Sequence, residues 1–527
     1  MDAQVIKQMG RKLRNFITEF DDCFSRREPR EHLRTYVAGQ LSDLPRKSVE
    51  PIALAASVPP RTLQRFFSDV LWDHERLRDK TQWMVARDHS HPHAIGIIDE
   101  SGNPKKGKHT CGVKRQWCGN TGKIDNCVVG VHLAYAIGDF QCLLDSDLYL
   151  PRDLAENSVY REVTGIPEEV IYRKKVDIAL QQVGRALNNG VRVSAWTADE
   201  LYGRDRAFLD GLETLGQDYV VEIPCDFTGW THSPHILQKP TPSELRQKGR
   251  KRHFPRISRQ SDHPCEVRNL AVHSPKFYSQ KWKKYKIKDG EKGPVVWEVK
   301  AEPFYRKQGE KGLPGREHTL IVARNALKPD EVKYFLSNRV IGSGETTLQK
   351  LLWIAFSRWP VERCFEIGKR ELGMDHFEMR SWQGIHRHFY ISQLSQLFCA
   401  RVQHVLREKN FGESLFNGRA NPTGHINVAY RPNPALFGSQ KTLPEDGRNH
   451  RLSSKAQWPS SEISYASNLE NIAKQRGKYQ TVKNVYATGF MKMWRCRISK
   501  LHIRAYDDLI TCVTLNFRTF YRHKTIW

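Results

Sequence analysis

Short apolar segments with strand character alternate with helix-like segments between residues 93 and 224, and this alternation constrains the fold more than any other feature. Strands are expected first, followed by helix, strand, helix and strand, a pattern that predicts a mixed α/β fold. A turn is expected at Gly102–Lys105, directly after the first strand. The expected strands are 94–99, 111–117, 126–136, 142–150, 191–199 and 218–223, and the expected helices are 170–188 and 204–214.

The segments on either side of this alternation differ from it in periodicity and composition. Residues 1–88 read as a helical domain, and helical periodicity returns at 346–408, from Thr346 to Leu372 and from Gly384 to Leu406. Residues 225–345 are Pro-rich and basic, with strand-like pieces, which predicts an inserted, mainly-β subdomain. We therefore expect a core split into 89–224 and 346–408, followed by a basic C-terminal region at 409–527.

Two short helical segments in the first domain are separated by a proline-containing turn. They occupy residues 51–72, and Pro60 suits the start of the second helix. Arg61 and Arg65 fall one turn apart on one face of that helix. A helix-turn-helix that inserts its second helix into DNA fits this pattern. An ordinary helical hairpin with a surface arginine pair fits it equally well.

The charge of the chain points to a polyanionic partner. Lys and Arg total 84 against 58 Asp and Glu, a formal net charge of +26, which attracts DNA or RNA over long range. The eleven cysteines form no C-x-x-C pair, which favours a reducing compartment. With no signal segment and no membrane-length apolar run, we expect a cytoplasmic protein without a membrane partner.

Three acids are the candidates for chemistry. Asp99 and Asp199 each end an expected strand, and Glu362 lies in a helical segment with Arg358 and Lys369. Converging carboxylates repel one another unless a cation neutralises them, and oxygen ligands favour Mg²⁺ or Mn²⁺. Two such ions could act on a phosphodiester. Alternatively, the aspartates are turn formers and Glu362 simply pairs with Arg358. Glu366 is a rival third ligand.

These acids lie within motifs that resemble a known family. The motifs are Ile98–His109, Gly119–Cys127, Thr197–Gly203, Arg358–Glu362 and Trp382–His388, and together they cover roughly residues 30 to 405. Their residues, order and spacing resemble the DDE transposases of the insertion sequence 701 family, which is related to the insertion sequence 4 family.

The resemblance implies a fold and a set of roles. It implies an RNase H-like catalytic core with a β insertion between the second Asp and the Glu. It also implies that Asp99, Asp199 and Glu362 are catalytic metal ligands. The related signature Y-x2-R-x3-E-x6-K is matched by Arg358, Glu362 and Lys369, whereas its tyrosine position is Ala355. Hydrolytic nicking and strand transfer need only the acids, so the resemblance does not carry a hairpin or base-flipping step.

Other basic residues are candidates for DNA contact. Gly102–His109 nearly spells a phosphate-binding loop, but His109 replaces the hydroxyl residue that would hold Mg²⁺, so no nucleotide cofactor is expected. Its lysines approach DNA phosphate or are simply solvated. In the insertion, a solvated loop and an edge strand are the alternatives to a DNA path. The DNA-binding candidates are Arg61, Arg65, Lys105, Lys106, Lys108, Arg250, Lys251, Arg252, Trp282, Lys283, Lys284, Arg358 and Lys369.

The sequence thus predicts a cut-and-paste DNA transposase. Hydrolysis at the ends of an insertion sequence would free 3′-hydroxyls that join target DNA, in a homodimer bound to double-stranded terminal repeats and target. A catalytically silent DNA-binding regulator with the same fold is one alternative. An RNase H-like nuclease without strand transfer is another.

Overall fold

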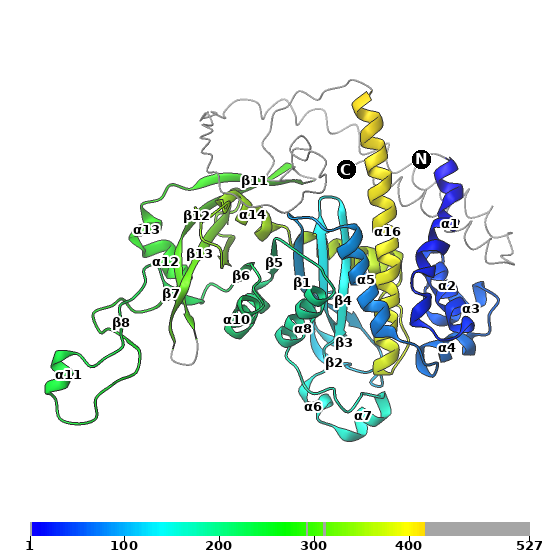
Figure 1. The fold of residues 1–527 in the computed structure, drawn as a ribbon, viewed down its shortest axis with the longest axis horizontal. Helices are drawn as coiled ribbons and strands as arrows, with labels where there is room; N and C mark the ends of the chain where they lie inside the picture. The colour runs from blue at the N-terminus through cyan, green and yellow to red at the C-terminus, as the bar shows by residue number, and fades with distance from the viewer. Residues whose placement is uncertain (1–2, 291–292, 309–311, 417–527) are drawn as a thin grey trace, which may run out of the picture. The chain divides into compact units, whose positions relative to one another are not determined.

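The protein is a mixed α/β molecule with helices at its N-terminal end (Figure 1). The computed structural model describes residues 3–290, 293–308 and 312–416, so nearly all of the expected basic C-terminal region lies outside the described residues. The N-terminal helices pack through buried aromatic and aliphatic side chains, and Pro60 begins one of them, as expected. These helices are α1 (Ala3–Thr18), α2 (Arg27–Leu41), α3 (Val49–Ala55), α4 (Pro60–Ser68) and α5 (His74–Asp88).

A five-stranded mixed sheet follows the helices. Its central strand β1 is antiparallel to β3 on one side and parallel to β5 on the other. The long strand β3 pairs first with β2 and then with β4. The strands of this sheet are β1 (Ile95–Pro104), β2 (Lys114–Cys118), β3 (Lys123–Ile137), β4 (Phe140–Leu148) and β5 (Ala195–Ala198).

A second, antiparallel sheet is joined to the first through β6 (Val220–Ile223). Trp196 of β5 forms a parallel bridge with Tyr219, and β6 then pairs antiparallel with β14. The expected β-rich insertion is therefore hydrogen-bonded to a strand of the α/β part. Its strands are β7 (Thr228–Trp230), β10 (Cys265–Glu266), β11 (Lys283–Gly290), β12 (Gly293–Gln308), β13 (Leu313–Asn325) and β14 (Val332–Ser337), and β8 (Ile236–Leu237) pairs separately with β9 (Arg256–Ile257).

Helices connect and cover the sheets. The long helix α16 (Trp382–Phe416) packs along β4, as does α5, and α8 packs on β3 and β4 (Figure 1). No helix among the described residues is long and apolar enough to cross a membrane. The other helices are α6 (Arg152–Ala155), α7 (Ser158–Thr164), α8 (Lys175–Asn188), α9 (Glu200–Gly203), α10 (Arg206–Thr214), α11 (Pro242–Arg246), α12 (Val267–His273), α13 (Pro275–Tyr278), α14 (Leu348–Phe356) and α15 (Trp359–Glu366).

Two local expectations are wrong. No turn interrupts β1 at residues 102–105, because the strand stays paired with β3 as far as Pro104 opposite Cys127. The expected helix at 346–372 is also not continuous, because α14 ends at Phe356 and α15 begins at Trp359. Pro360 lacks the N–H that an unbroken helix would need there. A π-helical turn at 367–371 then follows α15.

The parallel pair β1–β5 is closely packed. Gly96 lies opposite Trp196, and a Cβ at residue 96 would overlap the indole ring, which is fully buried. The register continues to Ile98 opposite Ala198. The residues that follow are Asp99 and Asp199, so this packing sets the two aspartates side by side.

Replacing Gly96 with Ala should therefore destabilise the fold. Overpacking of a buried site costs about 2 kcal/mol, and chemical denaturation of Gly96→Ala should show a loss of this size. Gly119→Ala is the control, since nothing lies within 4 Å of a Cβ built there. Equal stability of the two variants would mean that the packing of the Trp196 ring does not require glycine at position 96.

Candidate active site

Asp99 and Asp199 lie at neighbouring positions of two parallel strands. Asp99 is inside β1, where one carboxylate oxygen accepts a hydrogen bond from the N–H of Glu100 at 2.8 Å, and only 10 % of its side chain is exposed. Asp199 follows β5 and caps α9, accepting from the N–H of Leu201 at 3.0 Å. Local hydrogen bonds thus orient both carboxylates, each at the end of the parallel ladder.

Arg358 connects these aspartates to the helix that carries the third acid. Its Nη1 donates to Asp99 Oδ2 at 2.9 Å, and its Nη2 lies 4.0 Å from Glu362 Oε1. Arg358 is the residue before α15, and Glu362 is in the first turn of that helix with 54 % of its side chain exposed. One guanidinium therefore stands between a buried aspartate and an exposed glutamate.

Burial controls the charge state of this cluster. It raises the pKa of Asp99 to about 7, with the negative charge of Asp199 adding to the effect and the attraction of Arg358 only partly opposing it. Burial also raises the pKa of Asp199. The pKa of Arg358 is raised, because the charges of Asp99 and Asp199 outweigh the cost of burying it. The buried Asp99 and the half-buried Asp199 thus share one cation, which leaves them short of positive charge.

Two further acids, Glu222 and Glu100, flank the cluster, and neither was singled out from the sequence. Glu222 of β6 pairs with Lys333 Nζ at 2.8 Å and contributes to the raised pKa of Asp199. Glu100 pairs with Lys175 Nζ at 2.7 Å. The sequence holds no signal for Glu222, because it is brought beside the aspartates only by strand pairing.

The donor set fits a hard divalent cation. Asp99, Asp199 and Glu362 offer only carboxylate oxygens, which suit Mg²⁺ or Mn²⁺, and the guanidinium of Arg358 already serves as a stand-in positive charge between two of them. Within residues 3–416 as described, no group of three or more His, Cys, Asp and Glu side chains is placed to hold a metal ion. Glu366, the rival third ligand, pairs with Arg370 at 2.9 Å.

Lys369 and Lys105 bind backbone near these acids. Lys369 Nζ donates to the carbonyl of Gly102 in β1 at 3.0 Å, and burial lowers its pKa. Lys105 Nζ donates to the carbonyl of Phe377 at 2.8 Å and lies over the ring of that residue; burial lowers its pKa to about 8. Arg358, Glu362 and Lys369 therefore do not share one uninterrupted helix, since the π-helical turn carries the lysine. Lys106 and Lys108 are exposed.

The remaining DNA-binding candidates lie on other elements. Lys251 caps α11, donating to the carbonyls of Glu244 and Leu245 at 2.8 and 3.0 Å. The ring of Trp282 is contacted by Lys300 at 4.7 Å and by Arg324 at 4.1 Å. β11 is an edge strand, the arrangement that the sequence left open as an alternative. Exposed side chains are those of Arg61 and Arg65 on α4, Arg250 and Arg252 in the β8–β9 connection, and Lys283 and Lys284 on β11.

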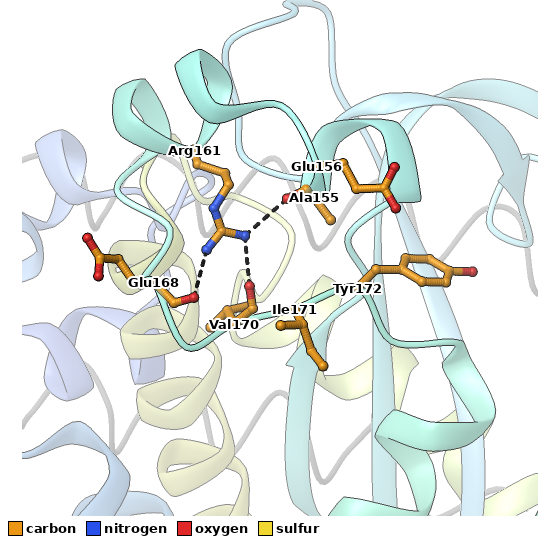
Figure 2. A pocket seen from close by; sticks show the side chains of 7 residues that line it. All are labelled: Ala155, Glu156, Arg161, Glu168, Val170, Ile171 and Tyr172. Carbon is orange, nitrogen blue, oxygen red and sulfur yellow. Dashed lines mark hydrogen bonds between the residues drawn. The ribbon is translucent and has the colours of Figure 1, made fainter.

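A pocket on the α6–α7 segment is built from different residues. Arg161 forms its centre, donating to the carbonyls of Ala155 at 3.0 Å, Val170 at 2.7 Å and Glu168 at 3.2 Å (Figure 2). A guanidinium bound to backbone carbonyls in this way holds the loop together and has few donors left for a ligand. None of the three candidate acids lines this pocket.

The fold and site define an α/β protein with two aspartates at the end of the parallel ladder between β1 and β5, one of which binds an arginine that precedes α15. The chain belongs to the DDE superfamily endonuclease family, whose model matches residues 19–294. It is also similar to the probable transposase for insertion sequence element IS701 of Microchaete diplosiphon, with 31% identity over 187 residues. That match spans 35% of this chain and 46% of the relative, so the chain covers about half of the relative's length.

The raised pKa of Asp99 predicts a pH-dependent difference in stability between the wild type and Asp99→Asn. Folding takes up a proton at this carboxyl between its unfolded pKa and about 7, so this carboxyl makes the folded wild type progressively less stable as pH rises through that window. The variant lacks this penalty. The free energy of unfolding of Asp99→Asn relative to wild type should rise by about 1 kcal/mol per pH unit from pH 4 to 7 and then level off.

Chemical denaturation at several pH values without divalent ions measures this difference. A constant offset, set only by the lost contact with Arg358, would show that Asp99 is ionised throughout. Glu366→Gln is the control, because that acid is half-exposed and paired on the surface.

Proposed function

We propose that the protein is a metal-dependent DNA transposase that cuts the ends of an insertion sequence and joins their 3′-hydroxyls to target DNA. The observation that carries the proposal is the apposition of Asp99 and Asp199 on parallel strands, with Arg358 between them and Glu362. Membership of the DDE endonuclease family and the similarity to a probable transposase support it.

We infer that the mixed sheet is an RNase H-like core. In support, its strands run in the order β4, β3, β1, β5, with the first three antiparallel and β5 parallel to β1. The bridge from Trp196 to Tyr219 adds β6 beyond β5. The first acid is on the central strand and the second on its parallel neighbour, and a helix that follows the β insertion supplies the third.

Each residue has a distinct role in the proposed reaction. Asp99, Asp199 and Glu362 would hold one or two Mg²⁺ or Mn²⁺ ions through their carboxylate oxygens. When bound, such ions act as Lewis acids and lower the pKa of water. Burial of Asp99 excludes bulk water from that side of the site, which strengthens the attraction between carboxylate and cation. Arg358 would leave Asp99 and pair with a DNA phosphate, a bidentate partner that suits guanidinium geometry.

The proposed reaction has two steps and forms no covalent bond between protein and DNA. In the first, a water oxygen attacks the phosphorus at the element end, the bond to the 3′-oxygen breaks, and that oxygen takes up a proton. In the second, the freed 3′-hydroxyl attacks a target phosphodiester and displaces another 3′-oxygen. The side chains named here orient the phosphate and the attacking oxygen, and none becomes bonded to DNA.

We propose that double-stranded DNA binds along the exposed cations. The exposed cations of α4, of the β8–β9 connection and of β11 would neutralise phosphates, and Lys106 and Lys108 lie on the segment directly after β1. Lys369 and Lys105 bind backbone carbonyls near the acids, so they would shape the site rather than bind DNA. Lys251 binds carbonyls of α11 and would hold the end of that helix. Because two element ends must be joined together, the active assembly is proposed to be a homodimer on DNA.

Mg²⁺-dependent nicking tests the proposal. The wild type should nick a plasmid carrying the element ends, and Asp99→Asn, Asp199→Asn and Glu362→Gln should each lose roughly 100-fold or more, since ligand loss weakens the ion and the transition state together. Glu366→Gln, one turn from Glu362, is the matched control and should stay active. A nicking activity that survives in all three variants would contradict the proposal.

Sites of cleavage in the same assay separate the alternatives. Cuts at the element ends followed by joined products support a transposase, and cuts without end preference indicate an RNase H-like nuclease without strand transfer. Binding without any cut identifies a silent regulator.

Arg358→Ala should separate metal binding from cleavage. Without the guanidinium, Asp99 has no competing cation, so Mn²⁺ affinity of the DNA-free protein should rise by about tenfold, the value of one charged hydrogen bond. Cleavage should fall, because the phosphate loses its partner. Electron paramagnetic resonance of free Mn²⁺ measures the affinity. A weaker affinity in the variant would mean that Arg358 supports the cation site instead of occupying it.

A further inference from the structure

The α6–α7 segment, residues 152–172, exposes apolar side chains to solvent. Val159 and Val163 are 68 % and 73 % exposed, and they lie one turn apart on the same face of α7. Ile171, in the loop that follows α7, is 70 % exposed. Large apolar side chains are unfavourable in water, and their concentration on one surface indicates a site where another molecule binds.

The same segment is acidic, although the chain has a formal net charge of +26. Its two arginines bind within the segment, Arg161 to backbone carbonyls and Arg152 over the ring of Tyr172 at 4.5 Å. Four exposed glutamates of the segment form no ion pair with any described residue: Glu156, Glu162, Glu168 and Glu169. Glu156 and Glu168 point away from the guanidinium of Arg161 (Figure 2). This uncompensated charge repels DNA and attracts a basic partner.

A second surface combines exposed apolar side chains with the opposite charge. Among the described strands, β8 and β9 pair only with each other, and α11 lies between them in sequence, so residues 236–257 form an arm separate from the two larger sheets (Figure 1). In this arm Leu245 is 57 % exposed and Phe254 is 49 % exposed. The single acid of the arm, Glu244, pairs with Arg256.

Cations follow the exposed leucine of the arm. Arg246 and Lys248 are exposed, and neither belongs to the set of residues proposed to bind DNA. The arm and the α6–α7 segment are therefore opposite in charge. Each also has apolar side chains that a contact between them would remove from water.

We propose that the arm of one copy of this chain binds the α6–α7 segment of a second copy. Phe254 and Leu245 would pack on Val159 and Val163, and the cations of the arm would pair with the glutamates. Exchange of both arms makes the same contact twice and closes a dimer with two-fold symmetry. This rests on the proposed function, which needs two copies on DNA, and it names the surfaces that would join them.

Photo-cross-linking tests whether these surfaces meet. p-Benzoylphenylalanine in place of Phe254 puts a photoreactive ring in the arm, and the full chain is irradiated without DNA or divalent ions. Mass spectrometry should find position 254 joined to residues 152–172. In a mixture of light and heavy isotope-labelled chains, peptides that carry both labels identify a contact between copies. The same ring in place of Trp83 of α5, which is 47 % exposed, is the control and should give no such cross-link.

Charge reversal tests the complementarity of the two surfaces. Glu162→Lys with Glu168→Lys should raise the dissociation constant of the dimer, measured by sedimentation velocity, by about tenfold, because each contact loses attraction and gains repulsion. Arg246→Glu with Lys248→Glu should have the same effect. An equimolar mixture of the two variants should restore wild-type association, since the mixed dimer has one unchanged contact and one with both signs reversed.

Glu28→Lys with Glu50→Lys is the matched control for the first variant. These exposed acids of α2 and α3 give the same change in net charge, and the variant should associate as the wild type does. Added salt should weaken the wild-type dimer, as expected for a contact between exposed charges.

A wild type that stays monomeric at low ionic strength would overturn the inference. So would cross-links confined to one chain, charge reversals without effect, or a mixture that fails to restore association. If a duplex is added and the arm cross-links only to DNA, the inference is also wrong. A wild type that associates through these surfaces and never nicks a plasmid would contradict the proposed function and leave the interface intact.

Discussion

The parallel pairing of β1 with β5 brings the buried carboxylate of Asp99 beside the half-buried carboxylate of Asp199, and the other side chains of the site compensate for the repulsion between the two charges. The register that places Gly96 beneath Trp196 also carries Asp99 and Asp199 to the same end of the ladder. Burying two like charges is costly unless a cation is near. In this chain the cation is Arg358, supplied from the turn between α14 and α15, far along the sequence.

This constraint explains why the helix after the β insertion has an irregular form. Arg358 must reach Asp99 while Glu362, one turn later, remains exposed. The break before Trp359 gives α15 its own start, and the π-helical turn at its end places Lys369 against the carbonyl of Gly102. Both ends of α15 are thus fixed to β1, the strand that carries Asp99. Such departures from regular helix are often found where function requires a fixed side-chain position.

The local pattern of apolar residues predicted the strands and helices better than it predicted the contacts between them. The strands that carry Asp99 and lead to Asp199 were readable from short apolar runs, although β1 continues past Asp99 to Pro104. The mixed α/β class followed from their order. The parallel register joins residues one hundred positions apart, and Arg358 binds an aspartate 259 positions away, so no spacing rule could give them. Glu222 comes near the aspartates only through the pairing of strands. The turn expected at Gly102 was wrong because pairing with β3 overrides the local preference of Gly and Pro. The roles of the three acids came from the resemblance to a family.

The central claim is that Asp99, Asp199 and Glu362 bind ions together. Substituting Fe²⁺ for Mg²⁺ in the DNA-bound protein and adding peroxide and ascorbate cuts a polypeptide close to the bound ion, and mass spectrometry locates the cuts. The account predicts cleavage near residues 99, 199 and 362 alike, suppressed by excess Mg²⁺. Cuts confined to one of these positions, or lying elsewhere in the chain, would contradict it.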